Sequence, residues 1–410
     1  MTQTALFSDA AQIQTEARHF DKIIVGGGMA GLMAAYEILR AAQAAGKKYR
    51  LAVLTARMNA PTAAGSSIEL GLDGFAAPHP YRDRINMRLR RGLERLQDIV
   101  HHEKIDCRLG MNYQLLGRSK EELETTAQWL VEHFGYRGDE IVPEKIQVAF
   151  KGFAAALTLR SSGQINMPEF MRGLAKAIKE MGGTIITGVD YRQQAPGAAA
   201  HVVTTDKGDF ISRQPPLLAL GGEGMRAVES LPTRIIPLYT AALHVALEKA
   251  DAAIVARAPV GFCDTEISGD IFWGSLDRKN MLTIGFGDVA DVRGRDRLEQ
   301  ELRQRLAELL PELSAKYTGK DALSFGAMAC TENKLPVVAR CDGFDVISGF
   351  GSRGIVPGVA VALDYARWDL HGQDAGLRLW ESLNEPGPQR RLQPGVHAPQ
   401  PGVTPGDGYP

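Results

Sequence analysis

The chain has 410 residues, of which 44% are hydrophobic and 23% are charged, and its net charge is −1. This length allows a large core divided into two or three domains. The balanced charge gives no overall field toward nucleic acid or an anionic membrane, so we expect no nucleic-acid partner. The N-terminal residues lack a secretory signal pattern, and no apolar run reaches the ~18 residues of a membrane span. We therefore expect a soluble, cytoplasmic protein with no membrane span.

The cysteines predict neither disulfide bonds nor a metal site. They stand at positions 107, 263, 330 and 341, without a C-x-x-C pair and without the spacing of metal ligands. Reduced, partly buried thiols in a cytosolic protein are the usual interpretation of such a pattern. We expect no metal in the site.

A strand, a glycine turn and a helix follow one another in the run DKIIVGGGMAGLMAA, which begins at residue 21. Its glycines match the dinucleotide-binding pattern G-x-G-x-x-G in the proper context. The first glycine permits a tight turn, the second lets the backbone approach a diphosphate, and the third allows close packing of helix and strand. The start of a helix favours a diphosphate, and the alternative is an ordinary Gly-rich turn. We assign the diphosphate to Gly26, Gly28, Met29, Ala30 and Gly31.

The first third of the chain continues with a second strand at residues 49–55, after a helix that ends near residue 44. With the first strand these elements form a β-α-β unit. A loop rich in Gly, Ala and Ser follows at residues 56–74. Apolar residues at helical spacing then predict helices at 82–103 and 121–134.

A new unit starts at Gly163, and Pro168 lies near the first position of a helix predicted over 167–181. Beyond residue 385 stand seven of the 21 prolines, which predict an extended or disordered tail. The other predicted elements are strands at 184–189, 201–210 with a turn at Lys207-Gly208, and 217–220, several strands from residue 239 to about residue 283, a helix from residue 297 that stops near Pro311, and a strand, glycine turn and helix at 344–368.

The series of blocks resembles the D-amino-acid oxidase superfamily of FAD-dependent amine oxidases, over about residues 20–375. The resemblance rests on the runs VGGGMAG, TAAGSS, INMPEFMRGLAKAIKEMGG, LLALGG, ACTENKLPVV and GFGSRGIVPGVA, in the family order. It implies an α/β fold, in which a Rossmann-like FAD-binding domain is joined to a second, mostly antiparallel-sheet substrate domain. The implied FAD-binding domain comprises residues 20–80, 155–230 and 328–375, the substrate domain comprises 81–154 and 231–327, and a Pro-rich tail covers 386–410.

The resemblance also implies which residues approach the FAD. The small residues of the TAAGSS loop would run along the cofactor, although a flexible surface loop is the alternative. The turn after residue 348 would present backbone N–H groups to the pyrimidine end of the flavin, where donors stabilise the reduced ring. Besides the first glycine turn, the implied cofactor residues are Thr55, Ala56, Arg57, Ala64, Gly65, Ser66, Ser67, Gly221, Gly222, Gly351, Ser352, Arg353, Gly354 and Ile355.

Three residues are candidates for the substrate site. Arg353 would lie beside the flavin ring, where its planar fork matches a substrate carboxylate; a surface arginine or a flavin-phosphate partner is the alternative. Trp273 or Phe272 would form a pocket wall, or plain core. Tyr239 follows the point where the family chain enters the substrate domain. The carboxylates Asp264, Glu266 and Asp270 are interpreted as loop residues.

Some positions depart from the family pattern. Thr55 stands where an acidic residue usually binds the adenosine ribose, and Arg57 two residues on leaves NADP open as an alternative. Thr283 matches the lysine that promotes reaction with oxygen in sarcosine oxidases. The family's covalent-flavin cysteine and histidine fall near Gly326 and Glu69. We therefore expect FAD to bind non-covalently.

The implied reaction is oxidation of the C–N bond of an amino acid or secondary amine to an imine, by hydride transfer to the flavin. The reduced flavin would be reoxidised by O₂ or another acceptor. One alternative is an enzyme like the oxidase that modifies the tRNA wobble uridine, although the chain lacks a basic stripe for tRNA. Another is a non-catalytic flavin-fold binding subunit, with the tail as its contact. A homo-oligomer or a partner subunit stays open.

Overall fold

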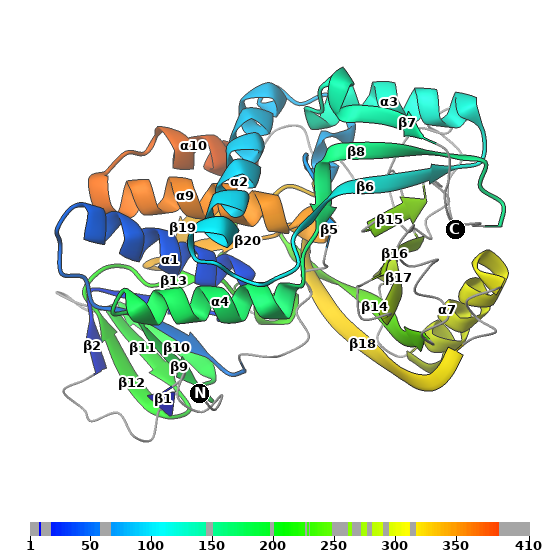
Figure 1. Cartoon of the computed structure of the whole chain (residues 1–410). Helices are drawn as coiled ribbons and strands as arrows, with labels where there is room; N and C mark the ends of the chain where they lie inside the picture. Colours follow the sequence, from blue (N-terminus) through cyan, green and yellow to red (C-terminus); the bar gives the residue numbers. More distant parts are fainter. Residues whose placement is uncertain are drawn as a thin grey trace.

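The computed structural model describes residues 8–9, 18–57, 67–144, 151–196, 201–225, 228, 230–247, 261–264, 272–276, 281–289, 295–311 and 317–384. Within these residues the strands form three sheets, and helices cover the first of them (Figure 1). Several sequence predictions lie outside the described residues. These are the loop residues Ala64, Gly65 and Ser66, the carboxylates Glu266 and Asp270, and the tail 386–410.

The central sheet of the described chain has seven strands in the order β1-β9-β4-β3-β13-β20-β19. Its pairs are parallel except for β19 with β20. Every residue of β3, β4 and β20 is buried, as expected for parallel strands covered on both faces. The strands are β1 (Ser8–Asp9), β3 (Lys22–Val25), β4 (Leu51–Thr55), β9 (Thr184–Thr187), β13 (Leu217–Leu218), β19 (Val337–Cys341) and β20 (Phe344–Ser348).

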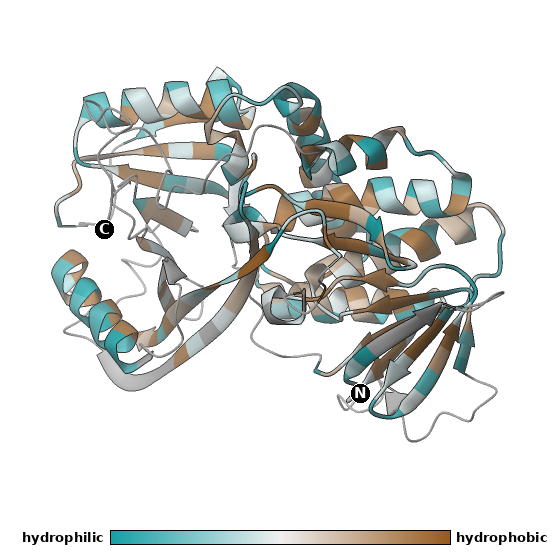
Figure 2. Ribbon diagram, turned by 180° about the vertical axis from the view of Figure 1, so that it is seen from behind, coloured by the Kyte–Doolittle hydropathy of each residue, from teal (hydrophilic) through white to brown (hydrophobic). Residues whose placement is uncertain are grey.

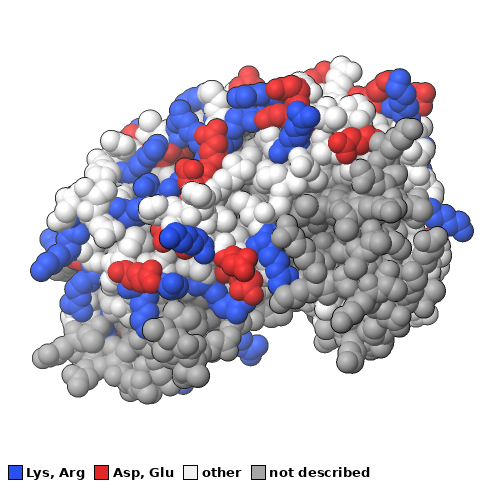
Figure 3. All heavy atoms as spheres, viewed as in Figure 1, with Lys and Arg blue, Asp and Glu red and all other residues white. Residues whose placement is uncertain are grey.

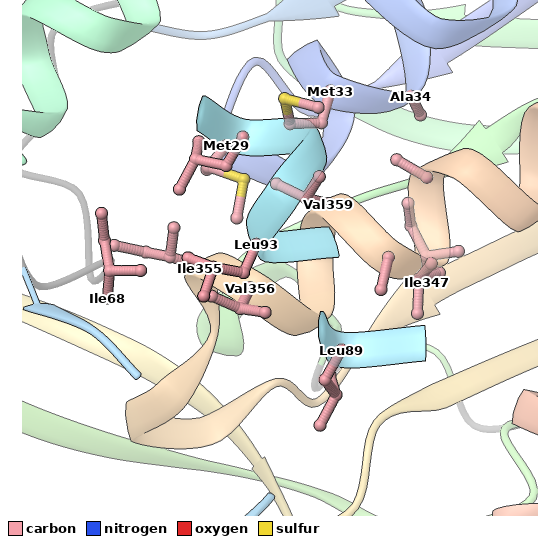
Figure 4. Packing of buried hydrophobic residues seen from close by; sticks show 14 of the residues in the cluster. Met29, Met33, Ala34, Ile68, Leu89, Leu93, Ile347, Ile355, Val356 and Val359 are labelled. Carbon is pink, nitrogen blue, oxygen red and sulfur yellow. The ribbon is translucent and has the colours of Figure 1, made fainter. Parts of the chain in front are cut away.

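Helices α1 (Met29–Ala44), α2 (Arg82–His102), α4 (Met167–Glu180) and α9 (Ile355–His371) pack together beside this sheet. Their apolar residues share one large core with the sheet, and Figure 4 shows Met29 of α1, Leu89 and Leu93 of α2, and Ile355 of α9 within it. A Cβ at Gly358 of α9 would come 2.6 Å from Met29 Cε. The glycine therefore lets the two helices that follow glycine turns pack closely.

A four-stranded sheet lies next to the central sheet and shares a second core with it. Its strands are β2 (His19–Phe20), β10 (Tyr191–Pro196), β11 (His201–Thr205) and β12 (Gly208–Ser212). The predicted turn between β11 and β12 is confirmed, because Gly208 has φ +101°, a conformation that glycine adopts readily.

The third sheet has nine strands, of which eight follow the order β18-β14-β17-β16-β15-β6-β8-β5, while β7 pairs with β8. All its pairs are antiparallel except β15 with β6. Helix α7 (Arg295–Leu309) packs its leucines on one face. The strands are β5 (Ser67–Ile68), β6 (Gly110–Gly117), β7 (Ile141–Glu144), β8 (Ala155–Gln164), β14 (Ile235–Leu247), β15 (Gly261–Asp264), β16 (Phe272–Leu276), β17 (Met281–Val289) and β18 (Tyr317–Thr331).

The remaining helices begin and end at residues suited to these positions. Helix α3 (Lys120–Phe134) starts where the Ser119 side chain accepts a hydrogen bond from the N–H of Glu122 at 3.1 Å, a typical N-cap. Asn166 caps α4 in the same way, with Pro168 in the first turn as predicted. The short helices are η4 (Asp73–Ala76), η5 (Gly138–Glu140), α5 (Gly222–Met225), η8 (Gly351–Arg353), α10 (Ala375–Glu381) and η9 (Ser382–Asn384).

The predicted α/β class with an added, mostly antiparallel sheet is confirmed. In Figure 2 the strands are largely hydrophobic, whereas the helices alternate between hydrophobic and hydrophilic faces. Strands β6, β7 and β8 were not predicted. Because β8 pairs with β6 in the nine-stranded sheet, that sheet extends past the proposed domain boundary at residue 155. The division into domains stays a prediction.

A buried ion-pair network joins β3 to β20 and α9. The side chain of Lys22 is fully buried, and its Nζ lies 3.0 Å from Asp345 Oδ2 and 2.9 Å from Asp369 Oδ1. The hydroxyl of Tyr365 donates to Asp345 at 2.6 Å, and that of Tyr49 donates to Asp369 at 2.9 Å. Lys22 therefore balances charge on both carboxylates, and Asp345 has Arg340 as a further partner, at 2.7 Å from Nη2 to Oδ1.

A second ion pair joins α2 to η5 and gives a prediction about acid stability. Arg90 donates to both oxygens of Glu140, at 2.7 and 2.8 Å. Burial alone would raise the pKa of Glu140, but hydrogen bonds from Arg90 and Ser161 outweigh burial and lower the pKa to about 2. A carboxyl with a lowered folded-state pKa stabilises the fold fully above its unfolded pKa of about 4.3 and loses this contribution as the pH falls toward 2.

We therefore expect Glu140→Gln to lower the melting temperature at neutral pH and to lower it less as the pH falls from about 5 to about 2.5. Thermal unfolding of the two proteins across this range measures the difference. Glu180→Gln serves as the control, because the Glu180 side chain is 62% exposed in a surface pair with Lys176. A difference between Glu140→Gln and the parent that stays constant with pH would contradict the assignment.

Among the described residues, no helix is both long and apolar enough to cross a membrane.

Candidate functional site

Three glycine turns lie side by side at one edge of the central sheet. The turn Gly26–Gly28 follows β3, the pair Gly221–Gly222 follows β13, and Gly349 follows β20. Since these strands are parallel neighbours in the order β3-β13-β20, their carboxyl ends meet at the same edge, where α/β folds bind ligands. Thr55, at the end of neighbouring β4, extends the row on the other side.

The first turn is closed tightly by its glycines. Gly26 has φ +120°, and a Cβ there would come 2.2 Å from the carbonyl oxygen of Ala219. A Cβ at Gly31 would come 1.9 Å from the carbonyl oxygen of Gly26. Neither position can hold a larger residue without displacing backbone, so both glycines have the structural roles that the sequence predicts.

Gly28 differs from these two glycines because it faces open space. A Cβ at Gly28 would meet no atom within 4 Å, and the same holds for Gly221. Helix α1 starts beside Gly28 with no side-chain cap and no acidic residue in its first turn. An open backbone at an uncapped, acid-free helix start fits a diphosphate. The residues present therefore fit a dinucleotide such as FAD along this edge.

The residues at the end of β4 give a weaker indication of cofactor binding. The Thr55 side chain is buried, its Oγ1 donates to the carbonyl oxygen of Arg57 at 3.2 Å, and it packs where a side chain at Gly27 would stand. Ala56 and Arg57 are exposed at the sheet edge. The hydroxyl is thus occupied locally, and a ribose or 2′-phosphate contact by Thr55 or Arg57 stays a prediction.

The third turn carries the other predicted cofactor residues. Gly349 and Gly351 have φ +73° and +63°, and Ser352 and Arg353 complete η8 before Gly354. Helix α9 then begins at Ile355 without a side-chain cap or an acidic residue in its first turn. A second uncapped helix start therefore lies at the same edge as that of α1.

Thr331, at the end of β18, supports this third turn. Its hydroxyl donates to the carbonyl oxygen of Leu335 at 2.7 Å, and its Cγ2 would lie 2.7 Å from a Cβ at Gly349. The long strand β18 thus connects the nine-stranded sheet directly to the turn after β20.

The guanidinium of Arg353 is bound by two carboxylates of the same chain. Its Nη1 lies 2.6 Å from Glu69 Oε2, and its Nε lies 2.9 Å from Asp73 Oδ1. The ring of Phe134 lies below the guanidinium, 4.5 Å from Cζ to the centroid. Burial alone would lower the pKa of Arg353, but the two carboxylates outweigh it and raise the pKa. Ser352 Oγ donates to the other oxygen of Asp73 at 2.7 Å.

This network changes the interpretation of Arg353. The sequence predicts a guanidinium that is free to bind a substrate carboxylate, whereas the structure shows it held by Glu69 and Asp73. Neither carboxylate was predicted as a site residue, because both stand more than 250 positions earlier in a loop without a helix or strand pattern. The run IELGLDG offers no signal that its two acids meet an arginine near the C-terminus.

Trp273 lies on the face of the nine-stranded sheet opposite α7. It pairs with Cys263 on one side and Gly285 on the other, and paired residues point to the same face. A Cβ at Gly285 would come 2.3 Å from the indole, so the glycine lets the ring lie on the sheet. Phe272 instead belongs to the core beneath α7.

This face lies within electrostatic range of the Arg353 network. Burial raises the pKa of the Cys263 thiol, and the nearby charges of Asp264 and Glu69 raise it further, while Arg353 lowers it. Tyr239 lies on β14 opposite Ala327, and a Cβ at Gly222 would come 2.6 Å from the carbonyl oxygen of the next residue, Met328. Strands β14 and β18 therefore approach the glycine-turn edge. Within the described residues no hydrogen bond or ring contact joins the side chain of Trp273 or Tyr239 to Arg353.

Comparison with known proteins defines the class. The profile of the FAD dependent oxidoreductase family matches residues 21–368, so the chain belongs to this family of flavin enzymes. FAD is its cofactor, as the sequence predicts. No curated protein matches the sequence.

Solved structures agree with this fold. Glycine oxidase from Geobacillus kaustophilus is 19% identical, with a TM-score of 0.65 over 88% of this chain and 95% of that one. L-proline dehydrogenase from P. horikoshii is 14% identical, with a TM-score of 0.67 over 87% and 94%. Iminodiacetate oxidase from Chelativorans sp. BNC1 is 13% identical, with a TM-score of 0.67 over 84% and 94%.

Proposed function

We propose that the protein oxidises the C–N bond of an amine or amino acid to an imine. One observation carries the proposal: the sheet edge with the three glycine turns lies next to a mostly antiparallel sheet. The family profile that matches this chain spans residues 21–368. Solved proteins of the same fold include an oxidase of glycine and a dehydrogenase of proline. A small amine substrate and a separate electron acceptor follow from this proposal.

In this proposal FAD lies along the three glycine turns, where Gly28 and Gly221 face open space. The diphosphate would lie at Gly28 and the start of α1, and the flavin end would lie at the turn before Ile355. When bound, FAD supplies the acceptor for a hydride from the substrate carbon. The assigned residues are Gly26, Gly28, Met29, Ala30, Gly31, Thr55, Ala56, Arg57, Ser67, Gly221, Gly222, Gly351, Ser352, Arg353, Gly354 and Ile355, together with Gly65 and Ser66 outside the described part.

The side chains of the nine-stranded sheet would close the other side of the site. Trp273 and Tyr239 would exclude water and orient the amine, which must be neutral at nitrogen when the C–H bond breaks. Such a reaction depends on positioning more than on an acid–base pair. Thr283, which stands at the position of the oxygen-activating lysine of sarcosine oxidases, is hydrogen-bonded to His244 Nδ1 at 3.0 Å. Either O₂ or another acceptor would reoxidise the reduced enzyme.

The alternatives receive less support. Lys and Arg alternate with Asp and Glu over the described part of the face in Figure 3, and a tRNA-binding surface would show a basic stripe. A non-catalytic binding subunit fits poorly with open space at Gly28 and Gly221. The four cysteines, all among the described residues, take part in no disulfide. The compartment and the oligomeric state stay predictions.

The experiment is anaerobic mixing of the FAD-loaded protein with D- and L-amino acids, glycine, sarcosine and larger amines. Loss of the oxidised-flavin absorbance near 450 nm (roughly, as for flavin cofactors) with at least one of them is the expected result, and imine hydrolysis should release an aldehyde, a keto acid or ammonia. A flavin that no amine reduces, but that a hydroxy acid or another non-amine reduces, would overturn the proposal.

A further inference from the structure

We propose that the substrate is an amine without a carboxylate next to its nitrogen, and that its nitrogen is held by Glu69. This inference rests on the proposed amine oxidation and specifies its substrate class. It starts from the guanidinium of Arg353, which the structure shows bound on two edges.

A guanidinium binds a carboxylate strongly through two parallel N–H groups. Each of its two forks combines Nη2 with either Nε or Nη1. In this structure Nε is bonded to Asp73 and Nη1 to Glu69. Nη1 carries two N–H groups, and besides Glu69 it reaches the carbonyl oxygen of Leu70 at 3.5 Å. Each fork therefore has one nitrogen that already has its acceptors, so a substrate carboxylate could bind with both oxygens only by displacing one of them.

The guanidinium is also held in place by its surroundings. Phe134 packs under its plane, and Nη1 reaches the carbonyl oxygen of Leu70 at 3.5 Å. Its side chain is only 14% exposed. Displacing either carboxylate would leave a partly buried charge without its partner. The free-energy cost of that unpaired charge is larger than the stabilisation that a solvent-exposed ion pair gives.

A third carboxylate would also meet repulsion. Glu69 and Asp73 already place two negative charges on one positive group, and a substrate carboxylate would lie within a few ångströms of both. A cationic or N–H-donating substrate meets the opposite situation, because the same two charges attract it. The network therefore selects against amino acids and in favour of amines.

Glu69 offers the contact atom. Its Oε2 accepts from Arg353, whereas its Oε1 has no hydrogen bond in the described residues, and the side chain is 18% exposed. An ammonium or amine N–H can donate to Oε1, and the charge attracts the protonated amine from solution. A proton released before C–N oxidation would pass from the substrate nitrogen to this oxygen or to water.

The experiment compares amines with their carboxylated counterparts on the FAD-loaded enzyme under anaerobic conditions. The pairs are benzylamine with D- and L-phenylglycine, dimethylamine with sarcosine, and cadaverine with D- and L-lysine. We expect the amine of a reactive pair to reduce the flavin at least about tenfold more efficiently than its carboxylated counterpart. The carboxylated compound must displace one charge-assisted contact of Arg353, whereas the amine displaces none. If the carboxylated member is the faster one, the substrate class is wrong while the proposed function stands. If no member of any pair reduces the flavin but another amino acid does, the substrate class is again wrong while the proposed function stands, and if only a non-amine reduces it, both are wrong.

Two matched variants test the role of Glu69. Glu69→Gln and Asp73→Asn each remove one negative charge next to Arg353, but only Glu69→Gln alters the side chain that carries Oε1. We expect Glu69→Gln to weaken binding of α,α-dimethylbenzylammonium, which has N–H donors but no C–H bond on the carbon next to nitrogen, by about tenfold or more, and Asp73→Asn to weaken it by about threefold or less. The flavin absorbance change follows the binding. Equal losses in the two variants would show that the charge of the network, and not Glu69 Oε1, binds the cation. That result would overturn the assignment of Glu69.

Discussion

Gly28→Ala is expected to weaken FAD binding in a chain that otherwise folds normally. The Cβ would meet no protein atom within 4 Å, and the backbone at Gly28 is extended, with φ −75° and ψ −179°. A methyl group at this place would occupy the space that the diphosphate needs beside α1. We expect FAD binding to weaken roughly 10- to 100-fold, the value of one or two charge-assisted hydrogen bonds.

Fluorescence titration of the FAD-free chain measures this affinity, and thermal unfolding of the same FAD-free chain should change by less than about 2 °C. Gly138→Ala is the matched control, because a Cβ at Gly138 also meets no atom within 4 Å, and Gly138 lies in η5, away from the glycine turns. Gly31→Ala should instead destabilise the FAD-free chain, since its Cβ would strike the carbonyl oxygen of Gly26. Full FAD affinity in Gly28→Ala would mean that the diphosphate binds elsewhere.

Lys22→Met is expected to cause the largest loss of stability. The substitution keeps a side chain of similar length but leaves Asp345 and Asp369 without the ammonium group between them. Removing one partner of a buried ion pair costs about 3–5 kcal/mol, because the remaining charge stays buried. Arg340 still contacts Asp345, at 2.8 Å from Nε to Oδ1, so Asp369 should account for much of the loss.

Urea unfolding of the FAD-loaded proteins gives the free energy difference. Lys176→Met is the control, since Lys176 is 67% exposed in a surface pair and should change stability by less than about 0.5 kcal/mol. The double substitution Lys22→Met with Asp369→Asn should recover part of the loss, because the uncompensated charge is gone. A loss below about 1 kcal/mol in Lys22→Met would show that water or relaxation balances these carboxylates.

The parts of the fold that depend on local sequence were predictable. The run from Asp21 to Gly31 carries the strand, the turn and the helix start in adjacent residues, and the structure reproduces it. Helices α2, α3 and α4 agree with their predicted ranges to within one or two residues, because apolar periodicity and caps lie within the helix itself.

What the sequence did not reveal depends on residues that are distant along the chain. The middle of β8 is almost wholly buried in the nine-stranded sheet, yet its letters LTLRSSGQ mix polar and apolar residues without alternation. The partners of Arg353 show the same limit. An arginine at the end of a glycine turn looks free in a sequence, and only the fold brings Glu69 and Asp73 to it.

Strand β18 has a consequence for changing what the enzyme accepts. It runs without a break from Tyr317 to Thr331, and its last residue wedges against Gly349. Mutations that move this strand would also shift the turn after β20, where we propose that the flavin end of FAD lies. Broadening the range of accepted molecules should therefore start from β15 and β16, in the middle of the strand order, where the Trp273 indole lies over Gly285.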